Sequence, residues 1–164
     1  MKSQIETKDG KLVDLIWYVV LSPNAKPPEK SYKSAGWDLF AYGDYILNPG
    51  DTIKVNTGVS GAFRPGFVLI LKDRSGMGAK GIPRFAGVID WDYRGLIQVV
   101  MHNTTKKPFL IKHGDKICQG IFQELPDDDL VILTTMDELP DGMGQTERGA
   151  AGFGSTDSQD AWVQ

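Results

Sequence analysis

The chain has 164 residues, of which 41% are hydrophobic and 24% charged, and its formal net charge at pH 7 is −3. This composition is typical of one globular domain and excludes a disordered chain, and no apolar run is long enough to cross a bilayer. Because broad nonspecific binding to nucleic acid needs a basic surface, we expect no nucleic-acid partner. Because no apolar run is long enough to cross a bilayer, we expect no membrane partner either.

The chain contains one cysteine, Cys118, and two histidines, His102 and His113. A single cysteine excludes an intrachain disulfide and a zinc site built on several thiolates. A site for a hard cation, bound by carboxylates and by the phosphate oxygens of a ligand, stays open. We expect Cys118 to be an inert buried thiol and both histidines to be surface residues.

The first forty residues are expected to contain two strands separated by a loop. Residues 1–11 are polar, lack the basic-then-apolar layout of a signal peptide and are expected to be loose. This N-terminus favours a cytoplasmic protein and leaves a nuclear or viral-host location open. Residues 12–21 are rich in β-branched and aromatic side chains and are predicted to form a buried strand, and the prolines within residues 22–33 predict an irregular loop. Residues 35–41 form the next predicted strand, in which Asp38 is either an edge or turn residue or a ligand.

Short strands separated by turn residues continue through the rest of the chain. They are predicted at residues 45–47 and 52–55, at 57–63 and 67–71, at 109–111 and 116–122, and finally at 131–135. Many short strands at this spacing predict an all-β architecture. Within the strand at 116–122, Gln119 is either a core hydrogen-bonding residue or a substrate contact, because a buried amide needs partners.

Residues 73–81 are rich in small residues and follow a predicted strand. One helical turn here would bring exposed backbone N–H groups together with the Arg74 guanidinium and the Ser75 hydroxyl, which an anion site requires. The alternative is a glycine-rich loop with an incidental arginine.

Residues 87–95 carry two carboxylates, Asp90 and Asp92, at the tip of a hairpin-like pattern. Apolar residues lead into this segment and out of it, and Gly95 supplies further turn chemistry. A carboxylate at this tip can act as a general base on a water aimed at an electrophile. The alternative is that both aspartates are ordinary turn residues.

The composition changes after residue 140, so we predict a core at residues 1–140 and a flexible arm at 141–164. Residues 141–157 are rich in Gly and polar residues and are expected to be mobile. Within them, residues 148–156 combine Arg148, hydroxyls and one aromatic, Phe153, which suits contacts to phosphates and stacking on a base. A plain disordered terminus is the alternative.

Five segments of the chain, taken in order, resemble the five motifs of the trimeric dUTP pyrophosphatase (dUTPase) family. They are Ala35-Gly36-Trp37-Asp38-Leu39, Arg74-Ser75-Gly76-Met77, Gly87-Val88-Ile89-Asp90-Trp91-Asp92-Tyr93-Arg94-Gly95, Gly114-Asp115-Lys116-Ile117-Cys118-Gln119, and Arg148-Gly149-Ala150-Ala151-Gly152-Phe153-Gly154-Ser155-Thr156. The resemblance spans about residues 12–157. One such motif would be weak, whereas five in the same order are very specific.

The resemblance implies a jelly-roll-like distorted β-barrel that assembles as a homotrimer, with sites at the subunit interfaces and a C-terminal arm that closes over each site. It implies hydrolysis of dUTP to dUMP and pyrophosphate, with Mg²⁺ on the triphosphate. The chemistry of the residues agrees, because phosphoryl transfer depends on a positioned water and on neutralised charge more than on a covalent nucleophile.

The same resemblance implies roles for individual residues. Asp90 would activate the attacking water, Tyr93 would pack on the deoxyribose, and Asp38 would hold a magnesium-bound water. The substrate contacts would be Gly87, Ile89 and Gln98 to uracil, Arg74, Ser75, Gly76 and Gln119 to phosphates, Phe153 over the base, and Arg148, Gly154, Ser155 and Thr156 in the arm around the terminal phosphates.

Three departures from the family pattern stand out. Arg84-Phe85-Ala86 precedes Gly87 where the family more often has smaller or amide residues, and Ala151 and Asp157 replace usual glycines. Two rival functions also stay open. A dCTP deaminase-type relative would share the fold but would be expected to carry a catalytic glutamate in the central hairpin, and a dUTP-binding regulatory module would act on a partner protein.

Overall fold

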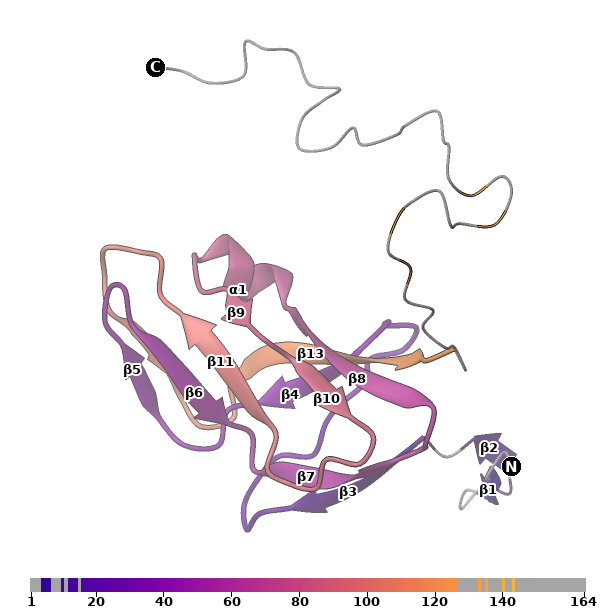
Figure 1. Cartoon of the computed structure of the whole chain (residues 1–164). Coiled ribbons are helices and arrows are strands. Elements are labelled where there is room, and N and C mark those ends of the chain that lie inside the picture. Colours follow the sequence, from indigo (N-terminus) through magenta and orange to yellow (C-terminus); the bar gives the residue numbers. More distant parts are fainter. Residues whose placement is uncertain are drawn as a thin grey trace. The chain divides into compact units, whose positions relative to one another are not determined.

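A computed structural model describes residues 4–6, 10, 12–14, 16–126, 133, 135, 140 and 143. The described residues form an antiparallel β structure with one short helix (Figure 1), which confirms the predicted all-β class. The strands are β1 (Gln4–Glu6), β2 (Leu12–Asp14), β3 (Trp17–Leu21), β4 (Trp37–Phe40), β5 (Tyr45–Leu47), β6 (Thr52–Asn56), β7 (Val59–Phe63), β8 (Phe67–Asp73), β9 (Arg84–Phe85), β10 (Val88–Asp90), β11 (Gln98–His102), β12 (Phe109–Ile111) and β13 (Lys116–Glu124), and the helix is α1 (Ser75–Ala79). No helix in this part of the chain is long and apolar enough to cross a membrane.

The central sheet has four strands in the order β10-β8-β13-β4, and every pairing within it is antiparallel. Strand β8 lies between β10 and β13 and runs directly into α1, which sits at the end of the sheet (Figure 1). Alternate residues of β8, among them Leu69 and Leu71, are buried because successive side chains of a strand point to opposite faces.

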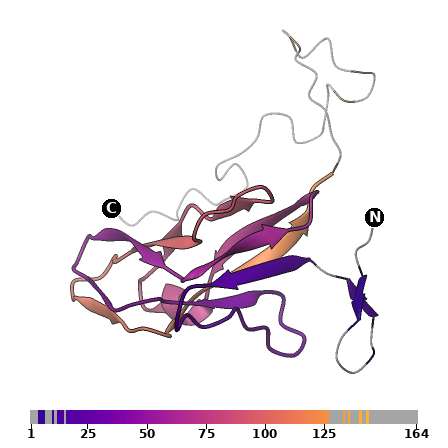
Figure 2. The same cartoon turned by 90° about the horizontal axis from the view of Figure 1, so that it is seen from below.

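Smaller sheets complete the jelly-roll-like barrel around one core. Their orders are β6-β11-β9, β12-β5 and β3-β7. Figures 1 and 2 show these strands from two directions. The core takes buried side chains from the central sheet, from the β6-β11-β9 sheet and from the β12-β5 sheet: Leu39, Leu69, Leu71, Val55, Val99, Met101, Leu47 and Ile111. The barrel is therefore held by apolar contacts between strands that lie far apart in sequence.

The predicted turns are in place, but the strands on either side of them do not pair with each other. Strand β5 pairs with β12 and β6 pairs with β11, and in the same way β7 pairs with β3 while β8 pairs with β10 and β13. Each turn moves the chain from one sheet to another, which is how a jelly roll covers both sides of one core.

The predicted hairpin around residues 87–95 is wrong in the same respect. Strand β9 pairs with β11, through Val100 with Phe85, and the chain then leaves this sheet so that β10 pairs with β8. The change of sheet occurs at Ala86 and Gly87, whose φ angles are 58° and 113°. Positive φ at two successive residues turns the backbone sharply, so the chain enters β10 in the other sheet, and a loop of residues 91–97 then leads back to β11.

Two predictions for the N-terminus are also wrong. Gln4–Glu6 is not loose, because it pairs with Leu12–Asp14 as β1 with β2. The predicted buried strand at 12–21 is two strands, and β3 is largely exposed in the single chain, with Tyr18 at 64% and Val20 at 62%. Strand β3 pairs with β7 alone, so packing covers little of its surface beyond Trp17, whose ring meets Phe122 at 5.5 Å.

The predicted last strand at 131–135 lies outside the described residues, apart from residues 133 and 135. The same holds for the arm at 141–164, apart from residue 143. The predicted boundary between core and arm thus stays a prediction.

Candidate functional site

A cluster of charged side chains lies where β4, β8 and β13 meet α1. The Asp38 carboxylate accepts hydrogen bonds from Arg74 Nε at 3.0 Å and from Lys116 Nζ at 2.8 Å, one on each oxygen. Lys116 also lies 3.6 Å from Glu29. The side chain of Asp38 is only 18% exposed, so its charge needs these two cations. Asp38 lies on β4, the edge strand of the central sheet, so the edge-residue alternative is confirmed, and its carboxylate pairs with two cations.

A β-bulge in β13 places Lys116 in this cluster. The register pairs Asp38 with Gln119, Leu39 with Cys118 and Phe40 with Lys116, so Ile117 is skipped. Because side chains alternate between faces along a strand, one skipped residue puts Lys116 on the face of Asp38 instead of the opposite face. The hydrogen bond with Asp38 raises the pKa of Lys116 above its ordinary value.

Arg74 stands immediately before α1 with an extended backbone, and its side chain reaches back over the sheet. Ser75 and Gly76, the first helical residues, are exposed, and nothing lies within 4 Å of the place where a Cβ on Gly76 would stand. The predicted single helical turn is confirmed. Its open surface beside Arg74 has the hydroxyl, the backbone and the guanidinium that an anion requires.

Gln119 is half-buried on β13 and donates a hydrogen bond from Nε2 to the carbonyl of Asp73 at 2.9 Å. It therefore lies beside Asp38 and Arg74 but has an internal partner, so both alternatives for this residue remain compatible with its position.

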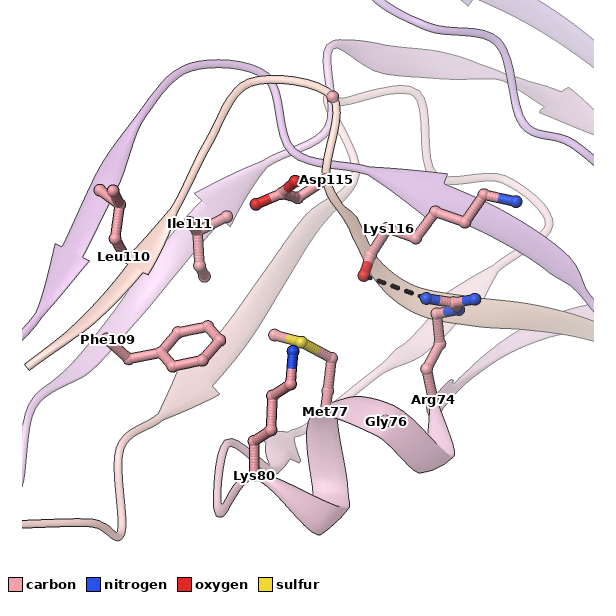
Figure 3. A pocket seen from close by; sticks show the side chains of 10 residues that line it. Arg74, Gly76, Met77, Lys80, Phe109, Leu110, Ile111, Asp115 and Lys116 are labelled. Atoms are coloured by element: carbon pink, nitrogen blue, oxygen red, sulfur yellow. Dashed lines mark hydrogen bonds between the residues drawn. The ribbon is translucent and has the colours of Figure 1, made fainter.

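A cavity of about 550 Å³ lies between α1 and the β12–β13 turn, next to this cluster (Figure 3). Figure 3 shows Arg74 at one end, hydrogen-bonded to the carbonyl of Lys116, and Lys80 beside Met77 and Phe109 at the other. Asp115, which also lines the cavity, accepts a hydrogen bond from the backbone of Lys112. The cavity shares Arg74 and Lys116 with the charged cluster, so it extends the same site.

Asp90 ends β10, and Asp92 lies on the loop of residues 91–97 that follows it. Asp90 is the last residue of β10 and is exposed, and neither aspartate has an ion pair or a side-chain hydrogen bond to the residues that the structure describes. The pairing of β10 with β8 fixes the backbone of Asp90, whereas Asp92 stands in the turn itself. Asp90 is thus the better-positioned candidate for a general base.

Tyr93 and Gly95 form a packed unit on this loop. The Tyr93 hydroxyl donates to the carbonyl of Leu96 at 3.0 Å, and the ring is 44% exposed. A Cβ on Gly95 would stand 2.3 Å from the Tyr93 hydroxyl oxygen, so glycine is required for the ring to lie there. Gln98 follows as the exposed first residue of β11.

Gly87 lies immediately before β10, and Ile89 is its middle residue. The carbonyl of Gly87 accepts a hydrogen bond from Leu71 at 2.7 Å, and Ile89 is half-buried against the core. The residues predicted to meet the base, the sugar and the water therefore lie on one segment, which begins at the turn before β10 and ends at the start of β11.

Within one chain, Asp90 and the charged cluster lie toward opposite ends of β8, whereas Gly87 stands beside Leu71, between them. Asp90 pairs with Val68, and Arg74 follows Val68 by six residues. At about 3.3 Å per residue the two positions are about 20 Å apart, too far for both side chains to reach neighbouring phosphates. The structure brings Asp38, Arg74, Ser75, Gly76 and Gln119 together, whereas Gly87, Ile89, Asp90, Tyr93 and Gln98 follow one another on the segment that runs from the turn before β10 to the start of β11.

The residues predicted in the arm, Arg148, Phe153, Gly154, Ser155 and Thr156, lie outside the described residues. Sequence reasoning missed Lys116, whose place depends on the bulge, and gave no role to Asp73 or Glu29. The only sequence feature that points to Lys116 is its place two residues before the buried Cys118. This feature predicts a solvent-facing lysine as well as it predicts a lysine in the charged cluster.

No group of three or more His, Cys, Asp or Glu side chains that could hold a metal ion occurs among the described residues. Cys118 is buried, as predicted, and desolvation raises the pKa of its thiol to about 12 although the nearby Arg84 charge opposes this. His113 is exposed, as predicted, and His102 is half-buried beside Thr52.

The family model for dUTPase matches residues 23–157, and thus covers every element of both groups. The chain belongs to the dUTPase family. It is 40% identical over 141 residues to the deoxyuridine 5'-triphosphate nucleotidohydrolase of Mus musculus, with 85% of this chain and 83% of the relative covered. The family inferred from the five motifs is thereby confirmed.

Solved dUTPase structures have the same fold. A mutant dUTPase of Staphylococcus bacteriophage 80alpha with dUpNHpp superposes with a TM-score of 0.74 at 24% identity, covering 85% of this chain and 97% of the other. A mutant dUTPase from phage phi11 of S. aureus, which coordinates a structural Mg(II) ion, has a TM-score of 0.68 at 24% identity, over 73% and 97% of the two chains.

Proposed function

We propose that this chain hydrolyses dUTP to dUMP and pyrophosphate in deoxynucleotide metabolism, supplying dUMP and keeping uracil out of DNA. The observation that carries the proposal is the match to the dUTPase family over residues 23–157, together with a relative of 40% identity named a deoxyuridine 5'-triphosphate nucleotidohydrolase. The positions of the two residue groups on the fold support it, since each offers what one half of this reaction needs.

In the proposed reaction, the Asp90 carboxylate takes a proton from a water whose oxygen bonds to the α-phosphorus. The bond from this phosphorus to the oxygen bridging to the β-phosphate breaks, and pyrophosphate leaves with that oxygen. An exposed carboxylate without a competing ion pair among the described residues is free to accept this proton. Its strand holds it in place, which is the larger part of such catalysis.

The other group would bind the triphosphate. Arg74, Ser75, Gly76 and Gln119 provide a guanidinium, a hydroxyl, open backbone and an amide near one another. The Asp38 carboxylate now pairs with Arg74, and a phosphate reaching this cluster would compete for the same guanidinium. Gly87, Ile89 and Gln98 would offer main-chain groups to uracil, and Tyr93 would pack on the deoxyribose and leave no room for a 2′-hydroxyl.

Magnesium fits this site as part of the substrate rather than as a resident ion. Both oxygens of Asp38 are engaged by cations, and no other carboxylate, histidine or thiolate group among the described residues could complete a coordination sphere. Mg²⁺ is commonly bound through one or two carboxylates, waters and substrate phosphates, so Asp38 would hold a magnesium-bound water. Bound magnesium would neutralise part of the triphosphate charge.

The separation of about 20 Å between Asp90 and Arg74 along β8 supports sites shared between subunits, which is the arrangement expected of a homotrimer. One chain cannot apply both residues to one triphosphate, whereas two chains meeting at an interface can. We therefore propose that each site takes Asp90 and Tyr93 from one subunit and Arg74 and Gln119 from a neighbour. The arm, with Arg148, Phe153, Gly154, Ser155 and Thr156, would close over the nucleotide and exclude water.

A turnover assay tests the proposal and separates it from its rivals. The wild-type chain should release pyrophosphate from dUTP, whereas a dCTP deaminase-type enzyme would release ammonia from dCTP, and a regulatory module would bind dUTP without turnover. Asp90→Asn should lower kcat by several orders of magnitude with dUTP binding retained, and the matched Asp92→Asn should lower it far less. Equal loss in both variants would refute the assignment of Asp90.

A further inference from the structure

The turn that starts β10 is held by one arginine that the predicted site did not include. The backbone N–H of Arg84 donates to Asp73 Oδ1 at 3.0 Å, and the Arg84 Nε lies 3.6 Å from the same oxygen. At its tip, Arg84 Nη1 donates to the carbonyl of Ala86. One side chain thus connects the end of β8 with the turn between β9 and β10.

This turn needs support from its surroundings. Ala86 has φ of 58°, a conformation that costs free energy for a residue with a side chain, and Gly87 follows at 113°. A Cβ on Gly87 would stand 2.8 Å from Arg84 Nη1 and 2.9 Å from Leu71 Cβ, so the guanidinium lies directly against the turn. Moving Arg84 would therefore free the Ala86 carbonyl and the backbone on either side of it.

Stability alone does not account for Arg84. Its side chain is only 16% exposed, and its Nε is buried without a hydrogen-bond partner. A desolvated charge with an unsatisfied N–H is costly, and an apolar side chain of similar length would avoid that cost. Its contacts with Asp73 and with the Ala86 carbonyl instead indicate that Arg84 holds the geometry of the turn.

We propose that Arg84 is a positioning residue for base recognition: it fixes the turn at Ala86 and Gly87 and thereby sets where the backbone of β10 meets the base. This inference rests on the proposed function. Asp73 links the same turn to the phosphate-binding group, because its carbonyl accepts the hydrogen bond of Gln119 and its successor is Arg74. Arg84 should accordingly control uracil selection more than the chemical step.

The test compares Arg84→Met and Arg84→Lys with Arg64→Met, a half-buried arginine that lies over the Phe67 ring and belongs to neither residue group. Arg84→Met should raise KM for dUTP roughly 10- to 100-fold, with a smaller change in kcat, and should reduce the preference for dUTP over dCTP. Arg84→Lys should recover part of the loss, because it keeps the charge beside Asp73 without the planar fork. Arg64→Met should change neither constant.

Amide hydrogen exchange gives a readout that does not depend on activity. The Leu71 N–H donates to the Gly87 carbonyl at 2.7 Å, so its exchange should quicken in Arg84→Met and stay unchanged in Arg64→Met. If Arg84→Met fails to fold, Asp73→Asn replaces it, since the amide keeps an acceptor for the Arg84 backbone and removes the charge.

Unchanged KM, unchanged dUTP preference and unchanged Leu71 exchange in a folded Arg84 variant would overturn the proposal. A lower melting temperature with unchanged KM and preference would also overturn it, because that result assigns Arg84 a structural role only. If the wild-type chain does not hydrolyse dUTP, the proposed function is wrong, whatever the role of Arg84. In that case, dUTP binding measured by calorimetry, together with the exchange of the Leu71 amide, decides whether Arg84 positions the turn.

Discussion

Mixing the Arg74→Gln and Asp90→Asn variants of this chain should restore dUTP hydrolysis that neither variant has alone. Each substitution removes one of two groups that the register of β10 on β8 holds about 20 Å apart, at about 3.3 Å per residue. In a homotrimer of Arg74→Gln chains every site lacks the guanidinium, and in a trimer of Asp90→Asn chains every site lacks the base. Mixed trimers can combine the intact halves.

The expected recovery follows from the shared-site arrangement. In an equal, random mixture, about one quarter of the sites receive Asp90 from an Arg74→Gln chain and Arg74 from an Asp90→Asn chain. Turnover should therefore return to about a quarter of the wild-type value per site. Both variants should fold, because Asp90 has no ion pair among the described residues and because Lys116 still pairs with the Asp38 carboxylate when Arg74 is replaced.

The assay is pyrophosphate release from dUTP after the two variants are unfolded and refolded together, with each variant refolded alone as the control. Native mass spectrometry, with one variant isotopically labelled, verifies that mixed trimers have formed. Mixed trimers without restored turnover would refute the shared site, since both groups would then have to act from one chain. Persistent monomers with full wild-type activity would refute it as well.

Three further predictions concern other parts of the chain. Gly95→Ala should displace Tyr93, whose hydroxyl oxygen would stand 2.3 Å from the new Cβ, and so weaken the discrimination of dUTP against UTP. Gly78→Ala should not, because nothing lies within 4 Å of its Cβ and its backbone is ordinary. Equal discrimination in the two variants would contradict the role of Tyr93. The Cys118 thiol should resist alkylation at pH 8 in the native chain and react in urea. Burial raises its pKa to about 12, whereas the unfolded thiol titrates near 8.5, so the free energy of unfolding should fall as pH rises from about 9 towards 12. This contribution to the pH dependence should vanish in Cys118→Ala. A chain cut before Arg148 should keep its fold and trimer yet lose most turnover, since the triphosphate would no longer be enclosed; near-native rates would mean that Ala151 and Asp157 have already made the arm dispensable.

Much of this protein follows from local sequence patterns. Turn chemistry is local, so Asn48–Asp51, Arg64–Gly66 and the segment around Gly114 end their strands where Pro, Gly and Asp predict, and Gly50, Gly66 and Gly114 have positive φ. The short helix after Asp73 and the burial of Cys118 were predicted in the same way. The order of five motifs was enough to identify the family, because motif order is a property of the chain itself.

The sequence alone determined the all-β class, the places of the turns and the family, and it predicts which residues bind phosphate and activate water. Only the tertiary structure decided which strands pair, and hence that β10 lies on β8 and not on β11. It also decided that a bulge brings Lys116 to Asp38, that Arg84 reaches Asp73, and that Arg74 and Asp90 stand far apart. Strand pairing depends on burying a common core from residues distant in sequence, and one skipped residue reverses the face of every side chain beyond it, so no local pattern specifies these contacts.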